Sequence, residues 1–317
     1  MATTPGAAFR ALLRARRGAL AADGALVLPG CFDGLVARMA ARKGFEALYL
    51  SGGGTSALSG VPDVGLVTAP QFCAKITNLA ATSGLPVLAD ADTGFEDATA
   101  TVHAYVRAGA AALHIEDQVF PKRCGHLGGK ELVPAEDFAG VVRRCADAAA
   151  ASGDPDFVVC ARSDARGVEG GSVDATIERL RRYADAGASM LFPEGLRAAD
   201  EFGAVAEALR ASHGDASDGG GGPFLLANMT EFGVSPLLPA RELGALGYDV
   251  AIFPMGVLRA AARAADAALD VLREGGTLEP LADAEGMLTR AALYDLLQYD
   301  PMDMPWDYPS AEVKKKK

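Results

Sequence analysis

The sequence predicts an α/β fold, a (β/α)8 TIM-type barrel, from three observations. Eight short apolar runs recur along the chain, and each is followed by a stretch with helical spacing. The runs lack polar–apolar alternation, which is typical of strands buried on both faces of a parallel sheet. The length of 317 residues also suits one barrel. The runs are Ala25–Pro29, Ala47–Ser51, Pro86–Asp90, Ala112–Glu116, Phe157–Ala161, Ser189–Pro193, Phe224–Ala227 and Val250–Pro254.

The stretches between these runs favour helices. They are rich in Ala, Leu and Arg, and glycines stand where the helices should end. The clearest predicted helices are Asp97–Ala108, Ala135–Ala151, Val173–Ala186 and Ala198–Ala211, with terminating glycines at Gly44, Gly109, Gly187 and Gly247. A doubly wound sheet is the alternative arrangement. It is disfavoured because no Gly-x-Gly-x-x-Gly motif follows the first strand.

The composition excludes several classes of function. The formal net charge is −11, whereas phosphate backbones select basic surfaces, so we expect no nucleic-acid partner. No apolar run is long enough to span a bilayer, so we expect no membrane partner. Five scattered cysteines without a Cys-x-x-Cys pair indicate a reducing compartment, with neither disulfides nor a zinc site. We therefore interpret the chain as cytoplasmic.

Polar side chains gather where the predicted strands end. In a barrel of this kind the active site lies at the carboxyl ends of the strands. The strand interiors carry almost no polar groups, so we expect the polar strand ends to form one site. These residues are Asp33, Ser51, Asp90 with Asp92, His114 with Glu116, Arg162 with Asp164, Glu194, Asn228 with Thr230, and Met255 with Arg259.

Three of these segments suggest particular chemistry. Asp90 and Asp92 could hold a hard divalent cation through oxygen, or could simply cap the next helix. Cys124 lies between cations in Lys-Arg-Cys-Gly-His, which favours a thiolate that exchanges a proton near neutral pH, although a lone cysteine is more often an inert buried thiol. The glycine run after Ser51 is either a flexible loop or a set of N–H donors for an anion.

Eight ordered segments resemble the isocitrate lyase/phosphoenolpyruvate mutase superfamily, and within it the methylisocitrate lyases. The resemblance extends from about Leu26 to Tyr294. The segments are Leu-Pro-Gly-Cys-Phe-Asp (28–33), Leu-Tyr-Leu-Ser-Gly-Gly-Gly (48–54), Asp-Ala-Asp-Thr-Gly-Phe (90–95), His-Ile-Glu-Asp-Gln (114–118), Pro-Lys-Arg-Cys-Gly-His (121–126), Ala-Arg-Ser-Asp-Ala (161–165), Phe-Pro-Glu (192–194) and Ala-Asn-Met-Thr-Glu-Phe-Gly (227–233).

The resemblance implies an assembly. Family members are barrels whose last helices swap between subunits, so we expect C-terminal helices swapped between subunits and a homotetramer, a dimer of helix-swapped dimers. We expect residues 1–285 to form the catalytic barrel. Residues 286–317 are then a C-terminal helix and tail that pack on a neighbouring subunit, although the tail from Gln298 onward matches nothing in the family pattern.

The resemblance also implies an activity and a site. The activity is Mg²⁺-dependent cleavage of the tricarboxylate 2-methylisocitrate to pyruvate and succinate in propionate catabolism, with Mn²⁺ as an alternative ion. The implied metal residues are Asp90 and Asp92, with Asp63 and Glu116 in the water shell. The implied catalytic residues are the general acid Cys124, with Lys122 and His126, and Tyr49 or Arg162 as the base. The implied substrate-binding residues are Ser51, Gly52, Gly53, Arg123, Gly125, Arg162, Glu194, Asn228, Thr230, Arg259 and Arg290.

Other activities remain open within the same superfamily. The segment that follows Cys124, Gly-His-Leu-Gly-Gly-Lys, also resembles oxaloacetate hydrolases and 2,3-dimethylmalate lyases. Phe232 favours methylisocitrate lyases, because the oxaloacetate hydrolases and 2,3-dimethylmalate lyases tend to have glycine at this position. Phosphonate mutases usually lack the thiol. A catalytically silent barrel is the alternative from another class, and its mark would be loss of Cys124 or of a metal-binding carboxylate.

Overall fold

A computed structural model of the chain describes residues 3–123, 128–213, 222–283 and 285–299. Eight parallel strands form a nearly closed barrel in the order β1-β8-β7-β6-β5-β4-β3-β2. A single bridge from Gly30 to Tyr49 joins β1 to β2. The strands are β1 (Leu26–Pro29), β2 (Leu48–Leu50), β3 (Val87–Asp90), β4 (Ala112–Glu116), β5 (Val158–Ser163), β6 (Met190–Pro193), β7 (Phe224–Asn228) and β8 (Val250–Phe253). The predicted barrel and its eight strands are confirmed.

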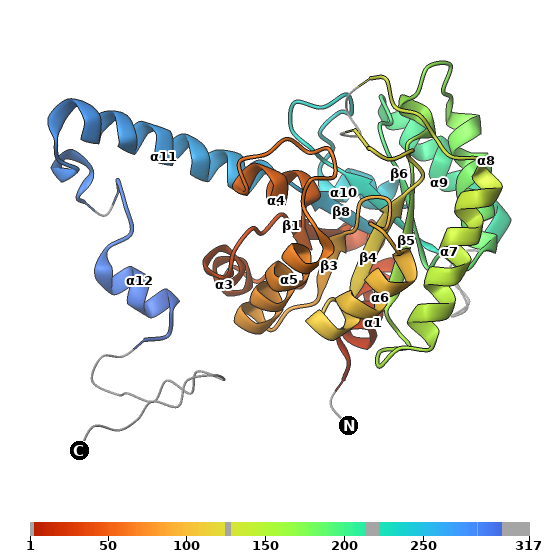
Figure 1. Cartoon of the computed structure of the whole chain (residues 1–317), viewed down its shortest axis with the longest axis horizontal. Helices are drawn as coiled ribbons and strands as arrows, with labels where there is room; N and C mark the ends of the chain where they lie inside the picture. The colour runs from red at the N-terminus through yellow and green to blue at the C-terminus, as the bar shows by residue number, and fades with distance from the viewer. Residues whose placement is uncertain (1–2, 124–127, 214–221, 284, 300–317) are drawn as a thin grey trace. The chain divides into compact units, whose positions relative to one another are not determined.

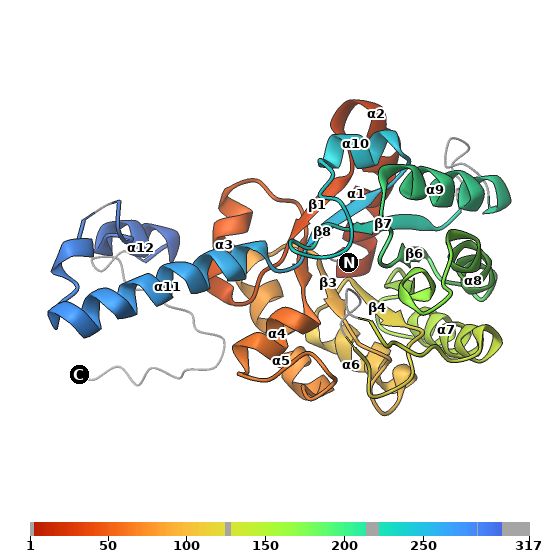
Figure 2. The ribbon, with the colours of Figure 1, turned by 90° about the horizontal axis from the view of Figure 1, so that it is seen from above.

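Helices α3 to α10 lie around the strands, as Figures 1 and 2 show. The helices are α1 (Pro5–Arg17), α2 (Leu20–Asp23), α3 (Gly34–Arg42), α4 (Gly52–Leu58), α5 (Ala69–Ser83), α6 (Ala98–Ala108), α7 (Ala135–Ala150), α8 (Val173–Asp185), α9 (Ala199–His213), α10 (Ala240–Ala245), α11 (Gly256–Gly275) and α12 (Arg290–Leu296), with short 3-10 turns at Ala165–Gly167 and Glu279–Leu281. Asp97 caps α6 by accepting the N–H groups of Thr99 and Ala100. Gly109 ends α6 with a φ of 92°, a left-handed conformation that glycine adopts without a steric penalty.

The apolar core has an inner and an outer layer. The outer layer lies between the sheet and the surrounding helices and includes Leu48 and Leu50. The inner layer fills the barrel and includes Tyr49, which alternates with them along β2. Phe9 and Leu13 of α1 belong to the inner layer and are fully buried. Packing of α1 into this layer leaves the opposite, carboxyl ends of the strands to carry polar groups.

The chain divides into two compact units, residues 1–263 and 264–317. The first contains the whole barrel. In the second, the rings of Tyr294 and Tyr299 meet edge to face with centroids 5.0 Å apart. The expected domain boundary after residue 285 and the helix swap stay predictions. Across the described ranges, no helix combines the length and the apolar character needed to cross a membrane.

Candidate functional site

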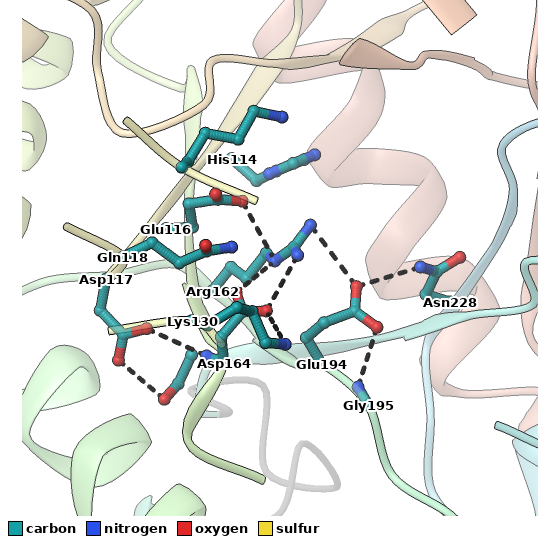
Figure 3. Close-up of polar contacts among 12 residues, drawn as sticks. His114, Glu116, Asp117, Gln118, Lys130, Arg162, Asp164, Glu194, Gly195 and Asn228 are labelled. Atoms are coloured by element: carbon teal, nitrogen blue, oxygen red, sulfur yellow. Dashed lines mark hydrogen bonds and ion pairs between the residues drawn. The ribbon is translucent and has the colours of Figure 1, made fainter. Parts of the chain in front are cut away.

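The site lies at the carboxyl ends of the strands, where the sequence predicts it. Figure 3 shows how its central side chains converge from neighbouring strands. The register explains the convergence, because Glu116 at the end of β4 pairs with Arg162 on β5. Asp33 does not take part in this way; its carboxylate accepts the Val36 N–H at 2.9 Å and caps α3.

Arg162 is the centre of the arrangement. Its Nε lies 2.9 Å from Asp164 Oδ2 and 3.3 Å from Glu116 Oε2, and its Nη1 lies 3.4 Å from Glu194 Oε2. Its Nη2 also donates to Asp164 Oδ1 at 3.1 Å. Burial lowers the pKa of Arg162, but Asp164 and the other carboxylates outweigh burial and raise it well above its usual value. Arg162 is therefore a fixed cation with a pre-set orientation.

Glu194 and Asn228 extend this cluster to β6 and β7. The Asn228 side-chain amide donates to Glu194 Oε2 at 3.1 Å, and the Gly195 N–H donates to Glu194 Oε1 at 2.8 Å. Three predicted substrate-binding residues, Arg162, Glu194 and Asn228, are thus brought together. Such a row of hydrogen-bonded charged and amide groups can hold and orient carboxylates.

A second cluster contains the predicted metal residues and Lys122. Asp90 Oδ2 accepts the Gly52 N–H at 2.9 Å, and Asp90 Oδ1 accepts the Asp92 N–H at 3.0 Å. Asp92 has a φ of 47°, a left-handed conformation that aspartate tolerates better than most residues. The Lys122 ammonium forms ion pairs with Asp63 and, at 2.7 Å, with Asp92 Oδ1.

Burial and mutual repulsion set the charge of this second cluster. Burial, followed by the nearby charge of Asp90, raises the pKa of Asp92 to about 6. Burial raises the pKa of Glu116 well above its ordinary value. Burial lowers the pKa of Lys122, but Glu116 and Asp92 outweigh burial and raise it. The cluster is therefore a concentration of carboxylates held together by one cation.

The donor chemistry of this second cluster fits a divalent cation of the hard class, since carboxylate oxygens are the ligands such an ion prefers. Glu116 Oε1 is buried and has no hydrogen-bond partner among the described residues. In the arrangement found, the Lys122 ammonium lies among these oxygens. Within the described ranges, no three acidic, histidine or cysteine side chains are already grouped to hold an ion. Asp90, Asp92, Asp63 and Glu116 could hold the ion once Lys122 gives up its ion pairs.

Tyr49 and His114 lie between the two clusters. Tyr49 Oη and His114 Nε2 are 2.8 Å apart, and the same nitrogen lies 3.6 Å from Asp90 Oδ1. Burial, followed by the charge of Asp90, raises the pKa of Tyr49 well above its ordinary value. Burial lowers the pKa of His114. In this environment Tyr49 is a hydrogen-bonding phenol, so a base role needs a neighbouring charge to stabilise its phenolate.

The glycine run after Ser51 begins a helix and is not a flexible loop. Residues 52–58 form α4, and the Ser51 hydroxyl caps it by accepting the Gly54 N–H at 3.1 Å. Gly52 is required by close approach, because a Cβ there would lie 2.4 Å from Asp90 Oδ2. Its N–H is already bound to Asp90. The predicted carboxylate-gripping role of Ser51, Gly52 and Gly53 stays a prediction.

Of the remaining predicted site residues, the structure describes some and not others. Arg259 donates to the Glu231 carbonyl at 2.8 Å and lies 5.2 Å from the ring centroid of Phe232, which is 94% exposed. Thr230 lies two residues after the end of β7 at Asn228. Arg123 is exposed, and Arg290 begins α12 in the second unit. Three predicted residues lie outside the described ranges: Cys124, Gly125 and His126.

Sequence reasoning missed several buried polar residues of the site. Asp117 accepts the Ser163 hydroxyl at 2.8 Å and the Asp164 N–H at 3.0 Å. The Gln118 amide donates to the Arg123 carbonyl and accepts the Arg123 N–H, both at 2.9 Å. Lys130 is fully buried against Asp164. The polarity of Asp117 and Gln118 directly after a buried strand was an available signal, whereas Lys130 resembles any surface lysine.

Comparison with known proteins connects this geometry to one family. The family profile described as Phosphoenolpyruvate phosphomutase matches residues 17–273. The probable 2-methylisocitrate lyase 1 of Corynebacterium glutamicum is 44% identical over 90% of this chain and 89% of its own. The 2-methylisocitrate lyase of Escherichia coli is 40% identical over 93% of both chains.

Solved structures show the same relationship. A 2,3-dimethylmalate lyase, described as a PEP mutase/isocitrate lyase superfamily member, has a TM-score of 0.80 and 34% identity and covers 93% of this chain and 92% of its own. An oxaloacetate acetylhydrolase bound to 3,3-difluorooxalacetate has a TM-score of 0.80 and 33% identity, covering 93% of this chain and 94% of its own. A phosphonopyruvate hydrolase with oxalate and Mg²⁺ has a TM-score of 0.76 and 27% identity, covering 93% and 95%.

The ion pairs of Lys122 generate a stability prediction. In Lys122→Met the carboxylates of Asp63 and Asp92 lose their cation, so the free energy of unfolding at pH 8 with a chelator should fall by roughly 3 kcal/mol. Added Mg²⁺ should stabilise the variant more than the wild type. Urea unfolding with and without Mg²⁺ checks this, with the exposed Lys43→Met as a matched control. Equal stability of the two variants in chelator would contradict it.

Proposed function

The chain belongs to the phosphoenolpyruvate mutase/isocitrate lyase family, and from this premise we propose that it is a lyase that cleaves 2-methylisocitrate to pyruvate and succinate. One observation carries the proposal: eight relatives named 2-methylisocitrate lyase, two of them as probable, are 36–44% identical over 88–98% of the chain. A buried arginine and an amide beside residues that could hold a cation suit a tricarboxylate substrate. Propionate catabolism is the metabolic setting that fits this reaction.

The chemistry places distinct demands on the residues. The C2 hydroxyl loses its proton, the C2–C3 bond breaks, and the electron pair of that bond passes to the succinate carbon. The new C2 carbonyl belongs to pyruvate. A proton must then reach the succinate carbon, and we assign it to the Cys124 thiol, which Lys122 and His126 orient and tune. General acid–base steps of this kind are typically worth about 10²–10⁴-fold in rate.

A divalent cation held by Asp90 and Asp92, with Asp63 and Glu116 in its water shell, would supply positive charge next to the pyruvate half. We propose Mg²⁺, with Mn²⁺ as a substitute. A family relative solved with oxalate and Mg²⁺ supports this choice, as does the oxygen-only donor set. The backbone at Ser51–Gly53 is proposed to contact the pyruvate carboxylate.

The carboxylates of the substrate require cations in fixed positions. Arg162 is buried and oriented by three acidic residues, and its fork can bind a carboxylate through two bonds. Glu194, Asn228 and Thr230 extend the binding surface, and we assign the other carboxylates to Arg123, Gly125, Arg259 and Arg290. Of the two candidates for the base that deprotonates the C2 hydroxyl, Tyr49 and Arg162, we assign Tyr49, because the Arg162 guanidinium is a fixed cation and Tyr49 already holds a hydrogen bond to His114.

Oxaloacetate hydrolysis or 2,3-dimethylmalate cleavage is the second candidate. The solved relatives with these activities share 33–34% identity and a TM-score of 0.80 with this chain. Phe232 is the observation that separates the candidates. Its backbone has a left-handed φ of 61°, its ring lies beside the Arg259 guanidinium, and we propose that its segment lines the distal carboxylate of the substrate. A phosphonate mutase or a silent barrel has no comparable support.

We propose a homotetramer, a dimer of helix-swapped dimers, located in the cytoplasm. In this proposal residues 286–317 pack on a neighbouring subunit, while residues 1–285 form the catalytic barrel. Support comes from α11, which buries none of its residues within one chain although Leu269 and Leu272 lie one turn apart on it. These two side chains are 65% and 43% exposed. An apolar stripe of this kind is normally covered.

The assembly has a direct test by light scattering after size exclusion. The wild type should give the mass of four chains, whereas Leu269→Glu/Leu272→Glu should give a smaller species, because charges would enter an apolar interface. A double change of two exposed polar residues of the same helix, Asp266→Asn/Asp270→Asn, is the control. A monomeric wild type would refute the tetramer.

The activity prediction concerns four substrates and one side chain. With Mg²⁺ the wild type should release pyruvate from 2-methylisocitrate faster than from isocitrate, 2,3-dimethylmalate or oxaloacetate, and a chelator should stop the reaction. Cys124→Ser should lower kcat by at least about 100-fold, since a serine hydroxyl is a far weaker acid than a thiol. A coupled assay for pyruvate measures both. Turnover of dimethylmalate or oxaloacetate alone would select the second candidate.

A further inference from the structure

Two cations share one carboxylate beside the substrate-binding cluster. Lys130 Nζ lies 2.7 Å from Asp164 Oδ1. Arg162 donates to the same carboxylate from Nε at 2.9 Å and from Nη2 at 3.1 Å. The side chains of Lys130 and Asp164 are both 0% exposed. Figure 3 shows Lys130 and Arg162 converging on the carboxylate of Asp164. A fully buried lysine is uncommon, and it needs a compensating anion to remain charged.

The charges around Arg162 explain why a second cation is needed. Three carboxyl groups lie within 3.4 Å of its guanidinium: Glu116, Asp164 and Glu194. Acidic groups therefore outnumber this one cation where an anionic substrate would approach. Lys130 adds a second cation to the group.

The backbone of Asp164 is anchored by the buried side chain of Asp117. The Asp164 N–H donates to Asp117 Oδ1 at 3.0 Å, and Asp117 Oδ2 accepts the hydroxyls of Ser163 and Tyr183, each at 2.8 Å. Arg179 adds a further bond to Asp117 Oδ2 at 3.1 Å. The main chain at Asp164 is therefore fixed, and its carboxylate is held between Arg162 and Lys130.

We propose that Lys130 is a positioning residue for substrate binding: it compensates the charge of Asp164, so that Asp164 orients Arg162 without neutralising it. Arg162 then keeps its positive charge for a carboxylate of the ligand. This inference deepens the proposed function and rests on its assignment of Arg162 to carboxylate binding. The contacts of Lys130, Asp164 and Arg162 are the same whichever 2-hydroxy acid is cleaved.

A purely structural role for Lys130 makes a different prediction. The segment that contains Lys130 is already tied down by backbone bonds. Val119 N–H donates to the Glu131 carbonyl at 2.8 Å, and Val133 N–H donates to the Asp117 carbonyl at 3.0 Å. These bonds do not involve the lysine side chain. If Lys130 only anchored this segment, removing its partner Asp164 as well would add a second loss and could not restore binding.

The test is oxalate binding in the presence of Mg²⁺, measured by titration calorimetry without turnover. Lys130→Met should weaken binding by about tenfold, because an uncompensated negative charge would stand beside Arg162. Lys130→Arg keeps the charge and should bind within about threefold of wild type. The decisive variant is Lys130→Met/Asp164→Asn, which removes both charges and should bind oxalate at least about threefold more tightly than Lys130→Met.

Several outcomes would overturn the inference. They are an unchanged affinity in Lys130→Met, a Lys130→Arg variant as weak as Lys130→Met, a double variant no better than Lys130→Met, or no oxalate binding by the wild type. If Lys130→Met does not fold, Lys130→Arg and the double variant still decide the question. A wild type that shows this binding pattern but does not cleave 2-methylisocitrate would refute the proposed function and leave the inference intact.

Discussion

The buried guanidinium of Arg162 is the interaction on which the site depends. It ties together the ends of β4 and β5 through Glu116 and Asp164, and it reaches β6 and β7 through Glu194 and Asn228. Removing one partner of a buried charge network typically costs about 3–5 kcal/mol, because the remaining charges are left uncompensated. The same network that fixes the strand ends therefore also fixes a cation in the orientation that carboxylate recognition requires.

The barrel separates two kinds of charge at its carboxyl end. On the β3 side, Asp90 and Asp92 are fixed by backbone N–H groups and balanced by Lys122. On the β5 side, cations gather around Asp164. Tyr49 and His114 lie between the two. A 2-hydroxy acid with several carboxylates has the matching division, with a metal-binding end and ends that need arginine. The family relationship and this arrangement support the same reaction class.

The sequence was sufficient for the strands and for much of the site. Apolar runs identify buried strands, and a barrel places their polar carboxyl ends together, so Glu116 and Arg162 could be assigned to one site from the sequence. Three features needed three dimensions. The Gly52 N–H donates to Asp90, and Lys122 lies among the predicted metal residues. Lys130 is buried although its neighbours in sequence, Gly129 and Glu131, are exposed. Long-range charge compensation leaves no periodic pattern in a sequence.

The central claim is that the site breaks a C–C bond and then protonates the succinate half. The most direct measurement is the NMR spectrum of products formed from 2-methylisocitrate in D2O with Mg²⁺. We expect pyruvate and, in equal amount, succinate with one deuterium on a single carbon, because an exchangeable proton on the acid is delivered to the carbanion. Succinate without deuterium, or no succinate at all, would rule out this protonation step.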